Sequence, residues 1–188
     1  MSCYPCAPCY YPRPYGICNP CQPCERPCEK PCETIFNVIS STSQSLNTAT
    51  IASGATSTAV IASFSVDADT TSKFNTTTNE YTVPYSGFYQ LEAVINYENA
   101  LDTVVTEHPR ITIQILRNGS AISTAYAIGA LGGDSTSIKN SVSLSIVKYL
   151  NKNDLLKVSG TITNVAGSGT IPADAFRLIE RSFSGYKK

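Results

Sequence analysis

The sequence of 188 residues balances 14 lysine and arginine side chains against 14 aspartate and glutamate side chains, so its formal net charge is zero. This balance excludes a general electrostatic attraction to nucleic acid or to an anionic membrane. No stretch contains the roughly 18 apolar residues that a membrane-spanning helix needs, and the amino-terminal residues lack the basic and apolar regions of a secretory signal. We therefore expect no nucleic-acid partner, no membrane span and synthesis in the cytoplasm.

Residues 1–33 are predicted to form an extended arm that precedes a folded domain at 34–188. Eight of the eleven prolines lie in this segment, which excludes a helix and a central strand and favours a polyproline conformation. Such an arm suits cross-linking better than catalysis. It also holds every cysteine of the chain, and these are the disulfide candidates: Cys3, Cys6, Cys9, Cys18, Cys21, Cys24, Cys28 and Cys32.

The cysteine spacing predicts which thiols pair. In a polyproline helix, thiols three residues apart are separated by about 9 Å, whereas the Cα atoms of a disulfide are about 4.4–6.8 Å apart. A fold-back at the turn-rich stretch 10–16 would instead align two triplets that are symmetric about the bond between Arg13 and Pro14. The resulting rungs are Cys3–Cys24, Cys6–Cys21 and Cys9–Cys18, with Cys28 and Cys32 left over. Four-cysteine zinc sites and free thiols are the alternatives.

The domain at 34–188 shows a period of two in its apolar residues, interrupted by clusters of Gly, Asn, Asp and Ser, which predicts an all-β sandwich or barrel. The predicted strands lie near residues 36–39, 60–66, 89–98, 111–115, 121–127, 141–146, 155–162 and 176–183. Asn118-Gly119 predicts a type I′ hairpin, and Pro84 to Gly87 predicts a turn before the longest strand. Residues 40–59 are either a linker or an edge strand of small residues.

Three phrases of the domain carry a resemblance to a known family. They are YTVPYSGFY at 81–89, ILRNG at 115–119 followed by TAY at 124–126, and SLSI at 143–146 followed by LNKNDLLKV at 150–158. With these phrases, residues 55–183 resemble the globular head of the complement and tumour-necrosis-factor superfamily. The closing segment 176–181 departs from that family, because it lacks the usual Gly-Phe phrase.

The resemblance implies a fold and a mode of assembly. The implied fold is a single antiparallel jelly roll, a two-sheet sandwich of ten strands, preceded here by the cysteine- and proline-rich arm. Heads of this type commonly associate as trimers. Related single jelly rolls form pentamers at the vertices of large icosahedral DNA viruses, and similar heads occur on bacterial spore surfaces.

A search for catalytic, cofactor-binding or metal-binding residues yields no candidate. His108 is the only histidine and precedes a proline, so we interpret it as a solvated loop residue. The phrase GxSxG of a serine nucleophile is missing, and the glycine-rich stretches lack the Lys-Ser or Lys-Thr of a phosphate-binding loop. Asp67 and Asp69 carry the oxygen ligands that calcium prefers, but two aspartates at this spacing usually face solvent. We therefore expect no enzyme activity, no cofactor and no metal.

Arm and head together predict a structural, self-assembling protein. The most specific prediction is a minor capsid or vertex (penton) protein of a large DNA virus. Such a protein is assembled in the host cytoplasm and located in the virion, with its disulfide-laced arm as a tether. Its partners would be copies of itself, as a pentamer rather than a trimer, and neighbouring capsid or coat proteins. The alternative is a trimeric head on a spore or cell surface that binds a receptor or glycan.

Overall fold

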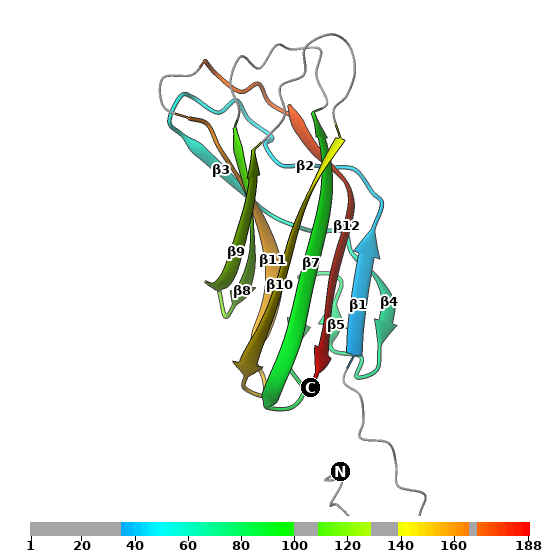
Figure 1. Ribbon diagram of the computed structural model, residues 1–188. Helices are drawn as coiled ribbons and strands as arrows, with labels where there is room; N and C mark the ends of the chain where they lie inside the picture. Colours follow the sequence, from blue (N-terminus) through cyan, green and yellow to red (C-terminus); the bar gives the residue numbers. More distant parts are fainter. Residues whose placement is uncertain (1–34, 100–108, 129–138, 166–168) are drawn as a thin grey trace, which may run out of the picture. The chain divides into compact units, whose positions relative to one another are not determined.

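Two antiparallel β-sheets pack face to face around a hydrophobic core (Figure 1). The computed structural model describes residues 35–99, 109–128, 139–165 and 169–188, all of which belong to the unit Thr34–Lys188. These described residues form twelve strands and no helix. They accordingly contain no helix that is long and apolar enough to cross a membrane.

Each sheet contains six strands among the described residues. The strands of the first sheet are β1 (Ile35–Ser40), β2 (Gln44–Ser45), β4 (Ser65–Asp69), β7 (Gly87–Asn99), β10 (Lys139–Leu150) and β12 (Phe176–Lys187). The strands of the second sheet are β3 (Thr56–Val60), β5 (Phe74–Asn75), β6 (Glu80–Thr82), β8 (Arg110–Arg117), β9 (Ser120–Ile128) and β11 (Leu155–Thr163). The predicted all-β class is therefore confirmed.

The connections between the sheets identify the fold as a jelly roll. The first sheet has the order β10-β7-β12-β1-β4, and the second has the order β5-β6-β11-β8-β9. From β6 onward the chain changes sheet at every connection except the hairpin between β8 and β9. Strands that are neighbours in a sheet are therefore mostly distant in sequence, as in the double-sheet jelly roll. The jelly-roll fold expected from the sequence is confirmed, with twelve described strands instead of the ten that the resemblance implies, and with β12 in the middle of the first sheet.

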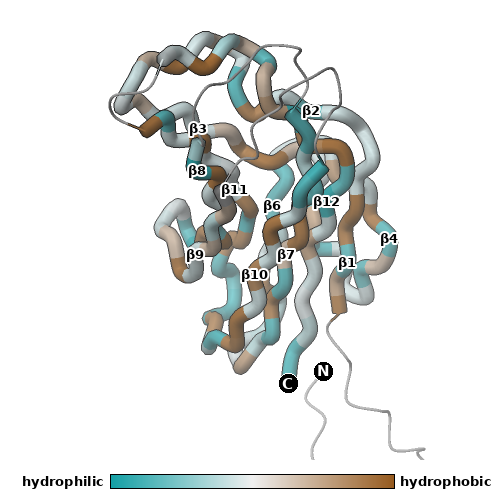
Figure 2. Tube along the Cα trace, turned by 45° about the horizontal axis from the view of Figure 1, so that its top comes forward, coloured by the Kyte–Doolittle hydropathy of each residue, from teal (hydrophilic) through white to brown (hydrophobic). Residues whose placement is uncertain are grey.

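Strict alternation decides which side of each long strand faces the core. Along β7, every second residue from Tyr89 to Tyr97 is buried, and the residues between them face outward. The same alternation is visible along β7 and β10 in Figure 2, where hydrophobic and hydrophilic positions follow one another. Because the side-chain period of a strand is two, the register of β7 against β10 and β12 fixes a complete outward face as well as a core face.

Aromatic residues from three strands form the centre of the core. The rings of Phe36 and Tyr81 are stacked with their centroids 3.9 Å apart, and Phe183 meets Phe36 edge-on at 4.9 Å. Gly185 lies beside them, because a Cβ atom at this position would be only 2.5 Å from Cε1 of Phe36. Among the described residues, the buried core begins at Phe36 in β1.

The predicted strand at 60–66 is wrong. In the structure β3 ends at Val60 and β4 begins at Ser65, and the two strands belong to different sheets. Ile61 and Phe64 are both buried, although they are three residues apart and break the period of two. The segment between the strands is a crossover, which the run of apolar residues conceals.

The predicted hairpin at Asn118-Gly119 is confirmed by backbone geometry, whereas the segment from Pro84 to Gly87 contains only a bend at Tyr85. Asn118 and Gly119 both have positive φ angles, 50° and 84°, and join β8 to β9 as a two-residue hairpin. This conformation is the one that a type I′ turn requires. The segment before Gly87 leads into β7, which at 13 residues is the longest strand. The stretch 40–59 contains β2 and the start of β3, which consists of small residues and pairs only with β11.

Candidate interaction face

The structure gives Asp67 and Asp69 separate structural partners. The carboxylate of Asp69 accepts hydrogen bonds from the backbone N–H groups of Thr71 at 3.0 Å, Lys73 at 2.6 Å and Phe74 at 2.7 Å. Burial opposes ionisation of this group, yet these hydrogen bonds hold the pKa of Asp69 below its ordinary value. Asp67 accepts a hydrogen bond from the amide of Asn37 at 2.9 Å. The two carboxylates thus close a turn and pair two strands.

The remaining residues singled out from the sequence lie outside the described residues. They are His108 and the eight cysteines of the arm. The disulfide pairing of these cysteines therefore stays a prediction. Within the described residues, no group of three or more histidine, cysteine, aspartate or glutamate side chains is placed to hold a metal ion.

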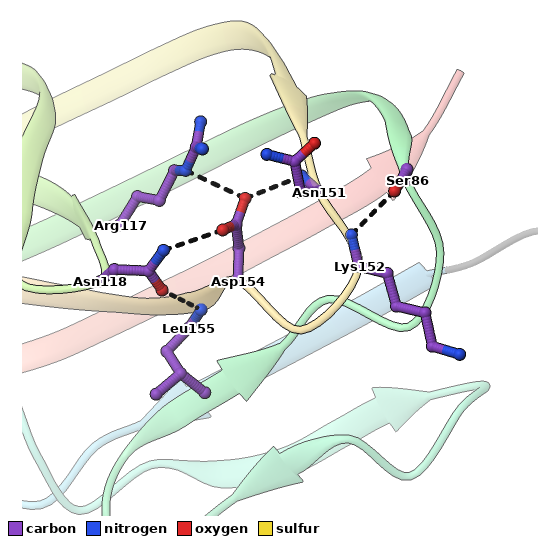
Figure 3. Close-up of polar contacts among 7 residues, drawn as sticks. All are labelled: Ser86, Arg117, Asn118, Asn151, Lys152, Asp154 and Leu155. Carbon is purple, nitrogen blue, oxygen red and sulfur yellow. Dashed lines mark hydrogen bonds and ion pairs between the residues drawn. The ribbon is translucent and has the colours of Figure 1, made fainter.

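A buried carboxylate ties together the turns at one end of the sandwich (Figure 3). We call this end, where β1 begins and β12 ends, the basal end. Asp154 forms an ion pair with Nε of Arg117 at 2.9 Å. It also accepts hydrogen bonds from Nδ2 of Asn118 at 2.8 Å and from the backbone N–H of Asn151 at 2.7 Å. The hairpin of β8 and β9 is thereby fixed to the turn between β10 and β11.

We call these contacts of Asp154 with Arg117, Asn118 and Asn151 the clasp, and two further hydrogen bonds extend it. Oδ1 of Asn118 accepts the backbone N–H of Leu155 at 2.8 Å, and Oγ of Ser86 accepts the backbone N–H of Lys152 at 2.9 Å. The turn that leads into β7 is therefore held against the turn after β10. Because these hydrogen bonds and the ion pair all join one segment of the chain to another, the clasp is a structural element that sets the position of the start of β7.

The outward side of the first sheet carries an exposed aromatic patch near the basal end. Phe88 and Tyr149 are register partners on β7 and β10, and their rings meet edge-on with centroids 5.3 Å apart. In the next row, Gln90 lies between Val147 and Tyr186, and the hydroxyl of Tyr186 donates to Oε1 of Gln90 at 2.7 Å. These five side chains form one continuous surface, which we call the aromatic patch.

Four of the five side chains of the aromatic patch are aromatic or aliphatic, yet these four are strongly exposed to solvent. Phe88 is 56 % exposed, Tyr149 and Val147 are each 48 % exposed, and Tyr186 is 43 % exposed. Toward the other end of β10, the outward residues are the serines at 141, 143 and 145, which add hydrogen-bonding groups without charge. Contiguous apolar surface with a polar surround is typical of protein interaction sites.

Sequence reasoning missed this patch, although one signal for it exists. Phe88 and Tyr149 stand in the outward phase of their strands, where the neighbouring positions are polar. An aromatic residue in the polar phase of an alternating strand indicates an exposed ring. That the two rings and Tyr186 belong to one surface depends on the pairing of β7 with both β10 and β12, which the sequence alone does not specify.

Comparison with known proteins finds similarity only at the level of structure. No protein-family model and no curated protein matches the sequence. A solved structure of the globular domain of zebrafish complement 1qA protein is similar to this chain, with 15 % sequence identity and a TM-score of 0.43. The similarity covers 82 % of this chain and 96 % of that structure.

Proposed function

We propose that this protein is a non-enzymatic structural component whose jelly roll assembles with copies of itself through the aromatic patch. The observation that supports the proposal is the exposure of Phe88, Val147, Tyr149 and Tyr186 on one face. Aromatic residues are enriched and charged residues depleted at the centres of protein interfaces. Closed cyclic assembly would bury this patch in every copy and leave none open for further growth.

The size of the patch sets what else the interface must contain. A stable interface buries about 800 Å² on each partner, and a fully buried aromatic side chain accounts for about 150–250 Å². Three half-exposed rings and one valine therefore supply the apolar centre but not the whole area. The serine-rich outward side of β10 supplies a polar rim of the kind that surrounds such a centre.

The most specific form of the proposal is a minor capsid or vertex (penton) protein of a large DNA virus. In this form the ring is a pentamer, the arm at 1–33 is cross-linked by disulfides and tethers the ring to neighbouring coat proteins, and the protein resides in the virion. The balanced charge of the sequence, which favours neither nucleic acid nor membrane, fits a role in a protein shell. The alternative is a trimeric head on a spore or cell surface.

Native mass spectrometry of the full chain, with and without reductant, tests the proposal. We expect a single closed oligomer at micromolar concentration; a pentamer supports the vertex protein and a trimer supports the surface head. The double variant Phe88→Ser/Tyr149→Ser should dissociate into monomers, because it removes the centre of the interface. Tyr126→Ser is the matched control, since Tyr126 is 69 % exposed on β9 of the other sheet. A monomeric wild type, or an unchanged double variant, would contradict the proposal.

A further inference from the structure

A second feature of the same sheet face is a hollow with a volume of about 420 Å³. Its floor is one row of side chains that crosses four paired strands. In that row Val94 lies beside Ser182, Ser182 beside Ile39, and Ile39 beside Ser65. Val94 is six residues along β7 from Phe88, which corresponds to about 20 Å of strand. The hollow is therefore separate from the aromatic patch.

Two irregularities of strand pairing flank the hollow. The register of β12 against β7 shifts between Leu178 and Glu180, and the register of β1 against β4 shifts between Asn37 and Val38. Such bulges bend a strand and redirect its side chains, and they are common beside functional sites. Here the shift in β12 leaves Glu180 exposed in line with Asn96, at the edge of the hollow.

A buried arginine fixes the rim of the hollow. Arg181 is only 3 % exposed, and its Nε and Nη2 atoms donate to the carbonyl oxygen of Ala62 at 2.9 and 2.6 Å. Its Nη1 atom donates to the carbonyl oxygen of Thr42 at 2.7 Å, and its guanidinium lies 5.9 Å from the ring centroid of Phe64. One side chain thus holds both segments that lead to Ser41 and Ser65 on the rim. The hollow is preformed, as ligand sites usually are.

The lining of the hollow offers hydroxyl, amide and carboxylate groups together with the apolar side chains of Val94 and Ile39. Nδ2 of Asn96 donates to Oε2 of Glu180 at 3.1 Å, so that the amide and the carboxylate are oriented together. Ser41, Ser65 and Ser182 add hydroxyl groups that both donate and accept hydrogen bonds. Val94 and Ile39 lie between them and offer C–H surface.

This chemistry selects among possible occupants. An anion would be repelled by Glu180, and the basic residue of the lining, Arg181, already donates its guanidinium hydrogen bonds to the carbonyls of Ala62 and Thr42. A metal ion would find a single carboxylate, and the described residues contain no group of three ligating side chains. An added peptide strand would find no free backbone edge at Val94, Ser182 or Ile39, because β7, β12 and β1 are each paired on both sides; of the described strands at the hollow, only β4, which contributes Ser65, is an edge strand. A neutral molecule with many hydroxyl groups and an apolar C–H face satisfies the whole lining.

We propose that the hollow binds a neutral carbohydrate, with Glu180 and Asn96 hydrogen-bonding adjacent sugar hydroxyls and the sugar ring lying on Val94 and Ile39. The inference goes beyond assembly, because it assigns a ligand class to a site that the aromatic patch does not include. It also differs from recognition through loops, since every strand that forms the floor is part of the sheet.

Saturation-transfer NMR of the full-length protein with maltose, cellobiose, lactose and diacetylchitobiose at millimolar concentration tests the proposal. At least one of these sugars should receive saturation from the wild type. Glu180→Gln and Asn96→Ala should each weaken its binding at least about tenfold, the loss expected when a hydrogen bond to a charged group or its positioning partner is removed. Glu92→Gln is the matched control, because Glu92 is an exposed carboxylate on the same side of β7 outside the hollow.

Three results would overturn the proposal: no saturation of any of the four sugars, equal saturation by the wild type and the Asn96→Ala/Glu180→Gln double variant, or a preference for glucuronate over glucose. The oligomer mass of the same samples is measured in parallel. Both hollow variants should keep the wild-type mass, so that a failure of sugar binding is distinguished from a failure of self-association.

Discussion

Replacement of Asp154 by alanine is expected to destabilise the protein far more than replacement of Glu80, although both carboxylates form ion pairs of nearly equal length. Asp154 pairs with Arg117 at 2.9 Å, and Glu80 pairs with Lys157 at 3.0 Å. The side chain of Asp154 is 7 % exposed, whereas that of Glu80 is 21 % exposed. Asp154 also serves two additional donors, the amide of Asn118 and the backbone N–H of Asn151.

The magnitude follows from the groups that the substitution leaves without a partner. In Asp154→Ala the amide of Asn118 and the N–H of Asn151 lose their acceptor. Both residues are exposed, so that water can take the place of the carboxylate, and each lost hydrogen bond costs about 0.5–1.5 kcal/mol. Breaking a fully buried ion pair costs about 3–5 kcal/mol, but the side chain of Arg117 is 29 % exposed and water compensates part of its charge. We therefore expect a loss of about 3 kcal/mol. Glu80→Ala removes a more exposed pair, for which about 0–1 kcal/mol is expected.

Urea denaturation of the full-length variants, followed by tyrosine fluorescence at one protein concentration, measures the difference. For a protein of this size, about 3 kcal/mol lowers the melting temperature by roughly 6–12 °C, which offers a second measurement. The slope of the free energy against urea should stay unchanged, because the unfolded surface is the same. The reasoning is refuted if Asp154→Ala loses no more stability than Glu80→Ala.

Three further predictions concern the core and the arm. Gly185→Ala should lower the free energy of unfolding by about 1–3 kcal/mol through overpacking, because the new Cβ would lie 2.5 Å from Cε1 of Phe36 and 2.7 Å from Cδ2 of Leu91. Urea titration measures this loss beside the control Ser184→Ala, whose side chain faces outward. Equal stability of the two variants would contradict the prediction. Burial raises the pKa of Tyr81 above its ordinary value. The contribution of the neutral Tyr81 hydroxyl to the free energy of unfolding is therefore complete below the unfolded pKa of about 10 and is lost as pH rises toward the folded pKa. Urea midpoints should fall above about pH 10, and they should fall less steeply in Tyr81→Phe. Deletion of residues 1–33 should leave cooperative unfolding intact, because the described residues from Phe36 onward already form a hydrophobic core between two sheets. A molten near-ultraviolet dichroism spectrum would contradict this.

Much of the fold could be predicted because alternation and turn chemistry are local. Every second residue of β7 is apolar from Tyr89 to Tyr97, and this pattern alone defines a strand with one buried side. Asn118-Gly119 specifies its hairpin through the positive φ angles that both residues adopt. The error at 60–66 arose because Ile61 and Phe64 are buried in a crossover. Their burial depends on contacts with distant segments, such as the hydrogen bond from the N–H of Ile61 to the carbonyl of Val158.

The two interaction features were beyond sequence reasoning for a different reason. Phe88, Tyr149 and Tyr186 come from three strands whose order in the sheet is β10-β7-β12, and a shift of one residue in either register would send the rings to different faces. The hollow depends in addition on the two register shifts in β12 and β1. Neither shift is marked by a glycine or a proline in its strand segment, so the sequence offers no local signal for them.

The strands that carry the aromatic patch and the hollow on their outward side also carry the core on their inward side. This arrangement separates the residues for interaction from the residues for packing. On β7, the outward Val94 lies between the buried Ala93 and Ile95; on β12, the outward Ser182 lies between the buried Arg181 and Phe183. Because both strands are paired on each side, their backbones fix the direction in which each outward side chain leaves the sheet. Sites on such strands are more precisely positioned than sites on loops. Outward substitutions can therefore test assembly and ligand binding without disturbing the packing that supports both.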